Sequence, residues 1–362
     1  MRKGNIQVLF TGYAYVHFVC FRSLYRYLNL RSDVDLFVSG GLRTRDGNRY
    51  LYDARKMYRI FGVNQARILS VDQIKKRHFD LLFAANTNMI LPGNAKTRIQ
   101  IFHGVSFRNR AVRPKHCRCD YYFLTGPYMH RLFVKAGLLD KNDPRAVPLG
   151  FMKTDRLLNG ELDRKSLLTQ YGLTGQRPVL LYAPTGLQKN SLEIMGDEVV
   201  KGICAADKYD LLIKLHDHSK NNDIDWTRRL KPCLGAHCQI VSDKDVIPLL
   251  YLSDLLITDA SSVSNEYTLL DRPIVFLDVP ELLTLAKMQE HSLMDLKTWG
   301  RKSGIIVKNP QKVAESIEYS LMNPHEYSEI RQAMARDLFY NPGQATPAAI
   351  SWLEKKYLCP KK

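Results

Sequence analysis

Two serines and an aspartate stand where a strand is expected to pass into a helix. Asp259, Ser261 and Ser262 follow the apolar run Leu255–Thr258, and a second apolar run, Ile274–Leu277, comes after a short helical segment. This order predicts a strand, a tight turn, a helix and a strand. Hydroxyls at a helix N-terminus lie beside free backbone N–H groups, which favour a phosphate. The alternative is an ordinary crossover in which a serine only caps the helix.

Glu266 lies one turn further along the same helical segment. A carboxylate at this place is positioned to accept hydrogen bonds from the two hydroxyls of a ribose. The alternative is a glutamate on the solvated side of the helix. With the turn before it, Glu266 makes this stretch a candidate nucleotide site.

His103 is a second candidate residue, in the first half of the chain. It directly follows the apolar run 98–102 and precedes Gly104. A histidine at the carboxyl end of a strand sits where open α/β sheets bind ligands. The alternative is a histidine whose ring only bonds the backbone at the strand end.

The elements that must position these residues alternate between strands and helices. We expect strands at residues 6–11, 34–39, 80–85, 98–102, 121–124, 178–182, 211–215, 239–241, 255–258, 274–277 and 304–307, with helices between many of them. This alternation predicts an α/β protein with two doubly wound halves, a cleft between them and a helical tail returning across the interface. The expected divisions are 1–157, a connection at 158–177, 178–340 and a tail at 341–362.

The charge balance is unusual for a protein of 362 residues. There are 53 lysines and arginines against 36 aspartates and glutamates, a formal net charge of +17. This excess indicates an anionic partner, either nucleic acid, an anionic membrane face or a phosphorylated substrate. The basic residues are spread along the chain without a recognisable nucleic-acid-binding module, so we do not expect nucleic acid.

One stretch between Arg43 and Arg59 concentrates six basic residues and is interleaved with tyrosines. It is a candidate membrane-surface or acceptor-binding face, because cations near an anionic leaflet each contribute ~1 kcal/mol to binding. The alternative is a solvated helix face.

No apolar run approaches the ~18 residues needed to span a bilayer, and the N-terminus leads into a strand pattern instead of a signal peptide. We therefore expect a cytoplasmic protein held at the inner face of the cell membrane by its charge.

The seven cysteines do not predict a disulfide framework in such a protein. Two groups, His116 with Cys117 and Cys119, and Cys233 with His237 and Cys238, invite a zinc interpretation. Neither has the paired Cys-x-x-Cys spacing of a structural zinc site, so we expect no metal.

Six motifs in order resemble the CDP-glycerol glycerophosphotransferase family, whose members are the primases and polymerases of wall teichoic acid and relatives that build capsules. The motifs, which begin near Ile99 and run through about two-thirds of the chain, are Gln100-Ile-Phe-His103-Gly104, Asp120-Tyr-Tyr-Phe-Leu, Leu149-Gly150-Phe-Met-Lys-Thr-Asp155-Arg156-Leu157, Leu181-Tyr182-Ala183-Pro184-Thr185, Ile213-Lys214-Leu215-His216 and Ser253-Asp254-Leu255-Leu-Ile-Thr-Asp259-Ala-Ser261-Ser262-Val263. The first hundred residues carry little of this resemblance.

The resemblance implies a GT-B fold, with a nucleotide donor bound mainly by the second Rossmann-like domain and an acceptor by the first. It implies no cofactor and no obligatory metal. The implied reaction is attack of an acceptor hydroxyl on the β-phosphorus of a CDP-alditol, with release of CMP. The acceptor would be a glycan or a lipid-linked molecule at the membrane.

Residue chemistry agrees with these implied roles. The diphosphate of a CDP-alditol must be bound by positively charged groups and by hydrogen-bond donors. Residues that follow neighbouring parallel strands can supply these groups together, because the carboxyl ends of parallel strands lie at one edge of the sheet. The expected donor-binding residues are therefore Gly104, Thr185, Lys214, Asp259, Ser261, Ser262 and Glu266, with His103 and His216 as catalytic residues and Gly12 and Arg108 on the acceptor side. Imidazole suits removal of the acceptor proton near neutral pH, so His103 is the expected base, facing His216 and the phosphates across the cleft.

Several positions depart from the family pattern. Val105-Ser106-Phe107-Arg108 stands where the family usually has Thr-Pro-Leu-Lys, and Lys214-Leu-His216-Asp217 stands where Arg-x-His-Pro is common. Glu266 resembles the ribose-binding glutamate of GT-B glycosyltransferases and UDP-sugar 2-epimerases. The alternative function is therefore a GT-B enzyme of that kind, which uses a nucleotide-sugar donor in the synthesis of cell-surface polysaccharide.

Overall fold

The computed structural model describes residues 4–85, 95–112, 118–216, 224–289 and 292–358. The protein divides into two compact units. The first unit comprises Met1–His103, Ala111–Asp155 and Leu338–Lys362, and the second comprises Gly104–Arg110 and Arg156–Asp337. Two segments differ from the expected divisions, since Gly104–Arg110 and the expected connection 158–177 both group with the second unit.

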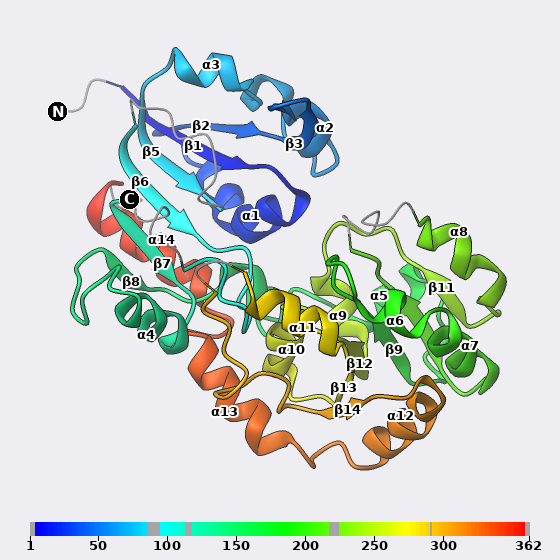
Figure 1. The fold of residues 1–362 in the computed structure, drawn as a ribbon. Coiled ribbons are helices and arrows are strands. Elements are labelled where there is room, and N and C mark those ends of the chain that lie inside the picture. Colours follow the sequence, from blue (N-terminus) through cyan, green and yellow to red (C-terminus); the bar gives the residue numbers. More distant parts are fainter. Residues whose placement is uncertain (1–3, 86–94, 113–117, 217–223, 290–291, 359–362) are drawn as a thin grey trace. The chain divides into compact units, whose positions relative to one another are not determined.

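The first unit is built on a six-stranded parallel sheet (Figure 1). Its strand order is β2-β1-β5-β6-β7-β8, and the strands are β1 (Ile6–Gly12), β2 (Val34–Gly40), β5 (Phe79–Ala84), β6 (Ala95–Ile101), β7 (Tyr121–Leu124) and β8 (Ala146–Pro148). Most residues of these strands are buried, because helices and loops cover both faces of a parallel sheet. Helix α1 (Tyr15–Asn29) buries Phe18, Phe21 and Leu24, and the Phe21 ring stacks on Phe10 of β1 at 4.6 Å between centroids.

A two-stranded antiparallel hairpin follows the carboxyl end of β2. It consists of β3 (Leu42–Asp46) and β4 (Arg49–Asp53) and leads into α2 (Ala54–Arg59). Gly41 permits this arrangement, since its φ is +113° and an added Cβ would lie 2.1 Å from the backbone nitrogen of Ala54. Figure 1 shows β3 and α2 beyond the end of β2.

The C-terminal helix α14 (Ala345–Lys356) completes the first unit. It packs beside α1, and its Trp352 ring contacts Phe123 of β7 at 5.2 Å between centroids. Asp155 caps its start by accepting hydrogen bonds from the N–H groups of Ala345 and Thr346, at 3.0 and 2.6 Å. A segment more than 180 residues distant in sequence therefore belongs to the core of this unit.

The second unit is built on another six-stranded parallel sheet. Its strand order is β11-β10-β9-β12-β13-β14, and the strands are β9 (Val179–Tyr182), β10 (Asp210–Ile213), β11 (Cys238–Ile240), β12 (Leu255–Thr258), β13 (Ile274–Leu277) and β14 (Ile305–Val307). Alternate residues of β9 enter two separate cores, with Leu180 on one face and Leu181 on the other. The sheet is therefore covered on both faces, as in a doubly wound fold.

Helices on each face supply these two cores. Helices α7 (Glu198–Ala205), α8 (Trp226–Leu230) and α12 (Val313–Met322) pack on one face, and α5 (Arg164–Gln170), α9 (Ile247–Leu252) and α10 (Val263–Tyr267) on the other. The remaining described α-helices are α3 (Val71–Lys75), α4 (Pro127–Lys135), α6 (Ser191–Met195), α11 (Pro280–Lys287) and α13 (Ser328–Leu338), and 3-10 turns occupy Gln65–Arg67, Met152–Leu157, Lys231–Cys233, Thr268–Leu270 and Pro310–Lys312. Within the described ranges, no helix is both long and apolar enough to cross a membrane.

Each sheet has a point where the strand order reverses. In the first unit this point lies between β1 and β5, and in the second it lies between β9 and β12. Open α/β sheets bind ligands outside the carboxyl ends of the strands at such a point. We therefore expect ligand-binding residues directly after β1, β5, β9 and β12.

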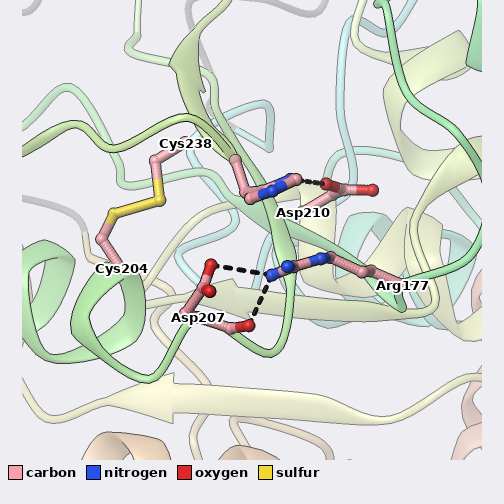
Figure 2. Close-up of a disulfide and its surroundings, with 6 residues drawn as sticks. Arg177, Cys204, Asp207, Asp210 and Cys238 are labelled. Carbon is pink, nitrogen blue, oxygen red and sulfur yellow. Dashed lines mark hydrogen bonds and ion pairs between the residues drawn. A yellow bond between two sulfur atoms is a disulfide. The ribbon is translucent and has the colours of Figure 1, made fainter.

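A disulfide joins Cys204, near the end of α7, to Cys238 at the start of β11 (Figure 2). Their Cα atoms are 6.3 Å apart, within the range that a disulfide spans. We did not expect a disulfide, because we expected a cytoplasmic protein. The sequence separation of 34 also hides the fact that α7 packs beside the edge of the sheet. The bond also removes Cys238 from the zinc interpretation, and His116 and Cys117 of the other group lie outside the described residues.

Candidate functional site

Asp259 connects two loops at the switch point of the second unit. It follows β12, is fully buried and accepts hydrogen bonds through both carboxylate oxygens. Oδ1 accepts from the N–H of Thr185 at 2.9 Å, and Oδ2 accepts from the Ser191 hydroxyl at 2.9 Å. These bonds hold the loop after β9 against the end of β12. Asp259 therefore positions the segment that contains Thr185 and Ser191.

Ser262 stands at the start of α10 but does not cap it. Its side chain makes no capping hydrogen bond, although the residue precedes the first helical position. The hydroxyl instead faces Gly104, where an added Cβ would lie 3.2 Å from Oγ. Ser261 and Ser262 are both half-buried. The alternative of a merely capped crossover is therefore not supported at Ser262.

The segment Gly104–Arg110 is part of this same site. The side-chain amide of Asn265 donates to the carbonyl of Val105 at 3.0 Å, and the N–H of Asp295 donates to the carbonyl of Phe107 at 2.8 Å. Phe107 is buried in a small cluster with Ala260 and Val279. The residues that follow His103 thus pack with the second unit, which sequence order alone did not indicate.

Arg108 is half-buried and carries one hydrogen-bond donor without a partner among the described residues. Its Nε atom is inaccessible to solvent and has no hydrogen-bond partner among the described residues. Burial, together with the neighbouring Arg110 charge, lowers the pKa of the Arg108 guanidinium to about 10, and the Asp259 carboxylate opposes that shift. The side chain remains protonated at neutral pH. An unpaired buried donor costs about 1–3 kcal/mol, and a bound anion would remove that cost.

Lys214 and His216 follow β10, beside the loop after β9. Lys214 is half-buried and its Nζ donates to the carbonyl of Leu215 at 2.8 Å. His216 is exposed, and its ring lies against Gly186, where an added Cβ would be 2.3 Å from Nδ1. Only glycine allows this approach. Since Gly186 directly follows the buried Thr185, these residues meet at the same edge of the sheet, as expected.

Glu266 lies inside the second unit. Its side chain is on α10 and the residue is fully buried. A carboxylate in this position contacts a ribose only if the ligand replaces the atoms that now cover it. The ribose contact remains a prediction.

A separate cluster forms at the switch point of the first unit. Gly12 ends β1, and an added Cβ there would lie 2.6 Å from Cβ of His17. The His17 ring lies 4.9 Å from that of His103, centroid to centroid. His17 is 2 % exposed. His17 is not part of any motif in the sequence, although a strand, a glycine and a helix at the start of the chain are typical of a turn that faces a ligand.

The backbone fixes which nitrogen of each ring carries a proton. The N–H of Tyr13 donates to Nδ1 of His17 at 2.9 Å, so this nitrogen is an acceptor and His17 is neutral with its proton on Nε2. Nδ1 of His103 contacts the carbonyl of Ala85 at 3.2 Å, and a carbonyl only accepts. Nδ1 of His103 is therefore the donor, and Nε2 carries the lone pair of the neutral ring. A backbone bond at a strand end, which we considered as an alternative to function, here sets the tautomer of the His103 ring.

The described residues contain no group of three or more His, Cys, Asp or Glu side chains arranged to hold a metal ion. What the two clusters offer is a cationic, donor-rich edge in the second unit and an imidazole pair in the first.

Comparison with known families places these residues in context. A model of the family described as CDP-Glycerol:Poly(glycerophosphate) glycerophosphotransferase matches residues 80–347. The chain belongs to this family. The matched range includes His103 and every residue discussed in the second unit, whereas Gly12 and His17 lie before it.

Curated relatives of this glycerophosphotransferase family are similar over part of their length. The teichoic acid glycerol-phosphate primase of Bacillus subtilis (strain 168) is 25 % identical over 247 residues, which is 65 % of this chain and 57 % of the relative. The teichoic acid poly(glycerol phosphate) polymerase of Staphylococcus epidermidis is 27 % identical over 212 residues, 50 % of this chain and 28 % of the relative. The chain thus spans less than two-thirds of the relatives it matches.

Solved structures with the same fold include two kinds of protein. The wall teichoic acid polymerase TagF is similar with a TM-score of 0.66 and 18 % identity, covering 97 % of this chain and 89 % of that one. A putative UDP-N-acetylglucosamine 2-epimerase from Listeria monocytogenes has a TM-score of 0.63 and 12 % identity, covering 98 % and 97 %. The predicted GT-B-type fold of two Rossmann-like units with a returning C-terminal helix is confirmed.

Proposed function

We propose that this chain transfers a glycerol-phosphate unit, or a related alditol-phosphate unit, from a CDP-activated donor to a hydroxyl of a teichoic-acid-like acceptor, and releases CMP. The observation that carries the proposal is Arg108, whose solvent-inaccessible Nε has no hydrogen-bond partner among the described residues and which follows Gly104 by four positions. Family membership favours the diphosphate of a CDP-alditol as the matching anion.

The donor diphosphate is assigned to the carboxyl edge of the second sheet. Arg108 and Lys214 supply positive charge, and the Ser262 hydroxyl supplies a hydrogen bond. Charge on the bridging oxygen increases as CMP leaves, so donors fixed in advance lower the barrier. This moves Arg108, which we had assigned to the acceptor, to the donor side. His216, exposed beside Gly186, is proposed to donate a hydrogen bond to the same diphosphate.

The acceptor is assigned to the first unit, at the Gly12, His17 and His103 cluster. His103 Nε2 takes the proton of the acceptor hydroxyl. The acceptor oxygen then forms a bond to the β-phosphorus, the bond from that phosphorus to the bridging oxygen breaks, and the electron pair leaves with CMP. The tautomer fixed by the Ala85 carbonyl puts the lone pair on the nitrogen that this step requires.

An assay of released nucleotide tests the proposal. The protein is incubated separately with CDP-glycerol, CDP-ribitol and UDP-N-acetylglucosamine, each with a poly(glycerol phosphate) acceptor. CMP release that depends on the acceptor supports the transferase. Release of a nucleoside diphosphate would support the nucleotide-sugar alternative, and no turnover of any donor would contradict both.

A matched pair of arginine variants tests the observation that carries the proposal. Arg108→Gln removes the half-buried cation, and binding of CDP-glycerol should weaken about 10- to 100-fold, the usual range for a charged hydrogen bond worth ~1.5–3 kcal/mol. Arg228→Gln removes an exposed guanidinium from α8 and should leave binding unchanged. If calorimetry gave the same affinity for CDP-glycerol in both variants, Arg108 would not be part of the donor site.

A further inference from the structure

The hairpin surface is a basic and apolar face of the first unit, formed by β3, β4 and α2. It carries six cations, Arg43, Arg45, Arg49, Arg55, Lys56 and Arg59, and only two acids, Asp46 and Asp53. None of the six cations forms an ion pair within the part of the chain that the structure describes. The charge of these six cations is therefore not neutralised by carboxylates of the described residues.

Apolar side chains are exposed among these cations. Tyr50 and Leu51 at the hairpin are each 53 % exposed, and Ile60 at the end of α2 is 54 % exposed. Cross-strand pairing places Arg43 opposite Tyr52 and Arg45 opposite Tyr50 on one side of the hairpin. Arg49 and Leu51 project from the other side, so cations and apolar groups occur together on both sides of this exposed hairpin. The combination of cations, tyrosines and exposed aliphatic groups is typical of protein surfaces at the boundary of a bilayer.

The hairpin is anchored to the candidate acceptor cluster. The Arg43 guanidinium lies over the rings of Tyr13 and Tyr50, 4.2 and 4.6 Å from their centroids. The N–H of Tyr13 in turn bonds the His17 ring. The first residue after β2, Gly41, donates its N–H to the carbonyl of Gly12 at 2.8 Å. The hairpin surface and the Gly12, His17 and His103 cluster therefore share the carboxyl edge of the first sheet.

We propose that the hairpin surface docks this protein onto an anionic phospholipid bilayer. The excess of four positive charges matches anionic headgroups, and the exposed Leu51 and Ile60 fit the apolar boundary below them. A soluble anionic polymer would satisfy the cations but gives no reason for the aliphatic groups. The contact does not depend on the transfer reaction proposed above. If that function holds, docking through this face brings a lipid-linked acceptor to the unit that carries His103.

Vesicle flotation tests whether the cations of the hairpin surface contribute to binding of anionic lipid. The full chain is mixed with vesicles of phosphatidylcholine containing 30 % phosphatidylglycerol, and Arg49→Gln, Arg55→Gln and Lys56→Gln are combined in one variant. Each cation near an anionic surface strengthens binding about fivefold, so this variant should bind about 100-fold more weakly. The matched control combines Arg118→Gln, Lys135→Gln and Lys141→Gln, exposed cations near the β7 and β8 edge of the same unit.

A double variant, Leu51→Ser with Ile60→Ser, tests whether the exposed aliphatic side chains contribute to membrane binding. Residual binding in 0.5 M salt, where exposed charges are largely screened, should fall at least fivefold in this variant. Its control is Leu30→Ser with Leu158→Ser, which removes exposed leucines elsewhere. Thermal unfolding of each variant shows that the protein is folded in the assay.

Three results would overturn the proposal. One is equal loss of binding in the hairpin and control triple variants, since general charge would then account for it. Another is binding that does not depend on phosphatidylglycerol. The third is saturable hairpin-dependent binding to soluble poly(glycerol phosphate) without binding to vesicles, which would make the polymer the occupant. Because no CDP-activated donor is present and only binding is measured, these results are independent of whether the chain has the proposed transferase activity.

Discussion

At the scale of single residues, the two histidines of the first unit show how backbone bonds prepare side chains for chemistry. His103 and His17 each bond the backbone through Nδ1, one as donor to Ala85 and the other as acceptor from Tyr13. The two rings consequently have opposite tautomers, although the residue type is the same. Sequence motifs selected His103 but contained nothing that distinguishes these protonation patterns.

Replacement of His103 tests its role as base. His103→Ala should lower kcat by ~10²–10⁴ with little change in affinity for CDP-glycerol, because proton removal is a step of the reaction and not of donor binding. Turnover is measured as CMP release at saturating donor. His78→Ala, at an exposed histidine of the same unit, is the control. Near-normal turnover in His103→Ala would rule out the assignment.

His17 is predicted to hold the acceptor-side turn and the His103 ring in place. His17→Leu removes the acceptor of the Tyr13 N–H and should lower the free energy of unfolding by about 1–3 kcal/mol and reduce kcat. In His17→Asn, Oδ1 takes the place of Nδ1, so most of the stability should return. The ¹⁵N shifts of the His103 ring report whether its tautomer has changed. A leucine variant with wild-type kcat and an unchanged His103 tautomer would contradict a positioning role.

At the scale of elements, the loops that follow strands decide how the polar side chains meet. The loop after β9 is held by Asp259 and carries Gly186, over which the His216 ring lies. The motifs predicted which strands these residues follow, and the parallel sheet brings the strand ends together. The approach of the imidazole to Gly186 depends on the conformation of two loops, which residue spacing does not encode.

Gly186→Ala tests that approach. The added Cβ would lie 2.3 Å from Nδ1 of His216, and because His216 is exposed its ring can move away at small cost in stability. We expect turnover to fall about 10- to 100-fold, as for other misplaced catalytic groups, with the unfolding temperature almost unchanged. Gly202→Ala in α7, where nothing lies within 4 Å of the new Cβ, should retain activity and gain about 0.5–1 kcal/mol in stability. Loss of activity in both variants would mean that the Gly186 effect is not specific.

The connection between α4 and β8 gives a prediction for pH. Hydrogen bonds from the Arg145 side chain lower the pKa of the Asp143 carboxyl to about 2. Since this is below the unfolded value of ~3.9, the bond stabilises the protein fully above pH ~5 and the contribution is lost as the pH falls toward 2. Asp143→Asn should therefore cost about 1–2 kcal/mol at pH 7, after allowance for solvent screening, and much less at pH 2.5. Urea unfolding at the two pH values measures this, and a cost independent of pH would point to packing.

At the scale of the whole molecule, the chain builds its units from segments that are not contiguous. The last helix completes the first unit, and seven residues after His103 complete the second. The second of these exchanges places two candidate site residues, Gly104 and Arg108, in the unit that the order of the sequence does not suggest. The same feature makes the stability of the first unit depend on the C-terminus.

Leu353→Ala tests this dependence. Leu353 on α14 is fully buried, so its truncation should destabilise the first unit by about 2–5 kcal/mol. Hydrogen exchange measured by mass spectrometry should show faster exchange in β1, β5 and β6 and unchanged exchange in β9, β10 and β12. Lys355→Ala, at an exposed position of the same helix, should change neither set. Faster exchange throughout the protein would mean that the two units unfold together.

The sequence by itself determined the α/β class, the alternation of strands and helices, the returning tail and the family, because apolar periodicity and short motifs are local properties of the chain. It also placed Thr185, His216 and Asp259 after the correct strands. Only the tertiary structure decided that Gly104–Arg110 packs with the second unit and that the His17 ring lies beside that of His103. It also decided that the buried Asp259 carboxylate binds the loop after β9 and that Cys204 forms a disulfide with Cys238. These facts depend on packing between segments far apart in sequence, for which local residue patterns carry no signal.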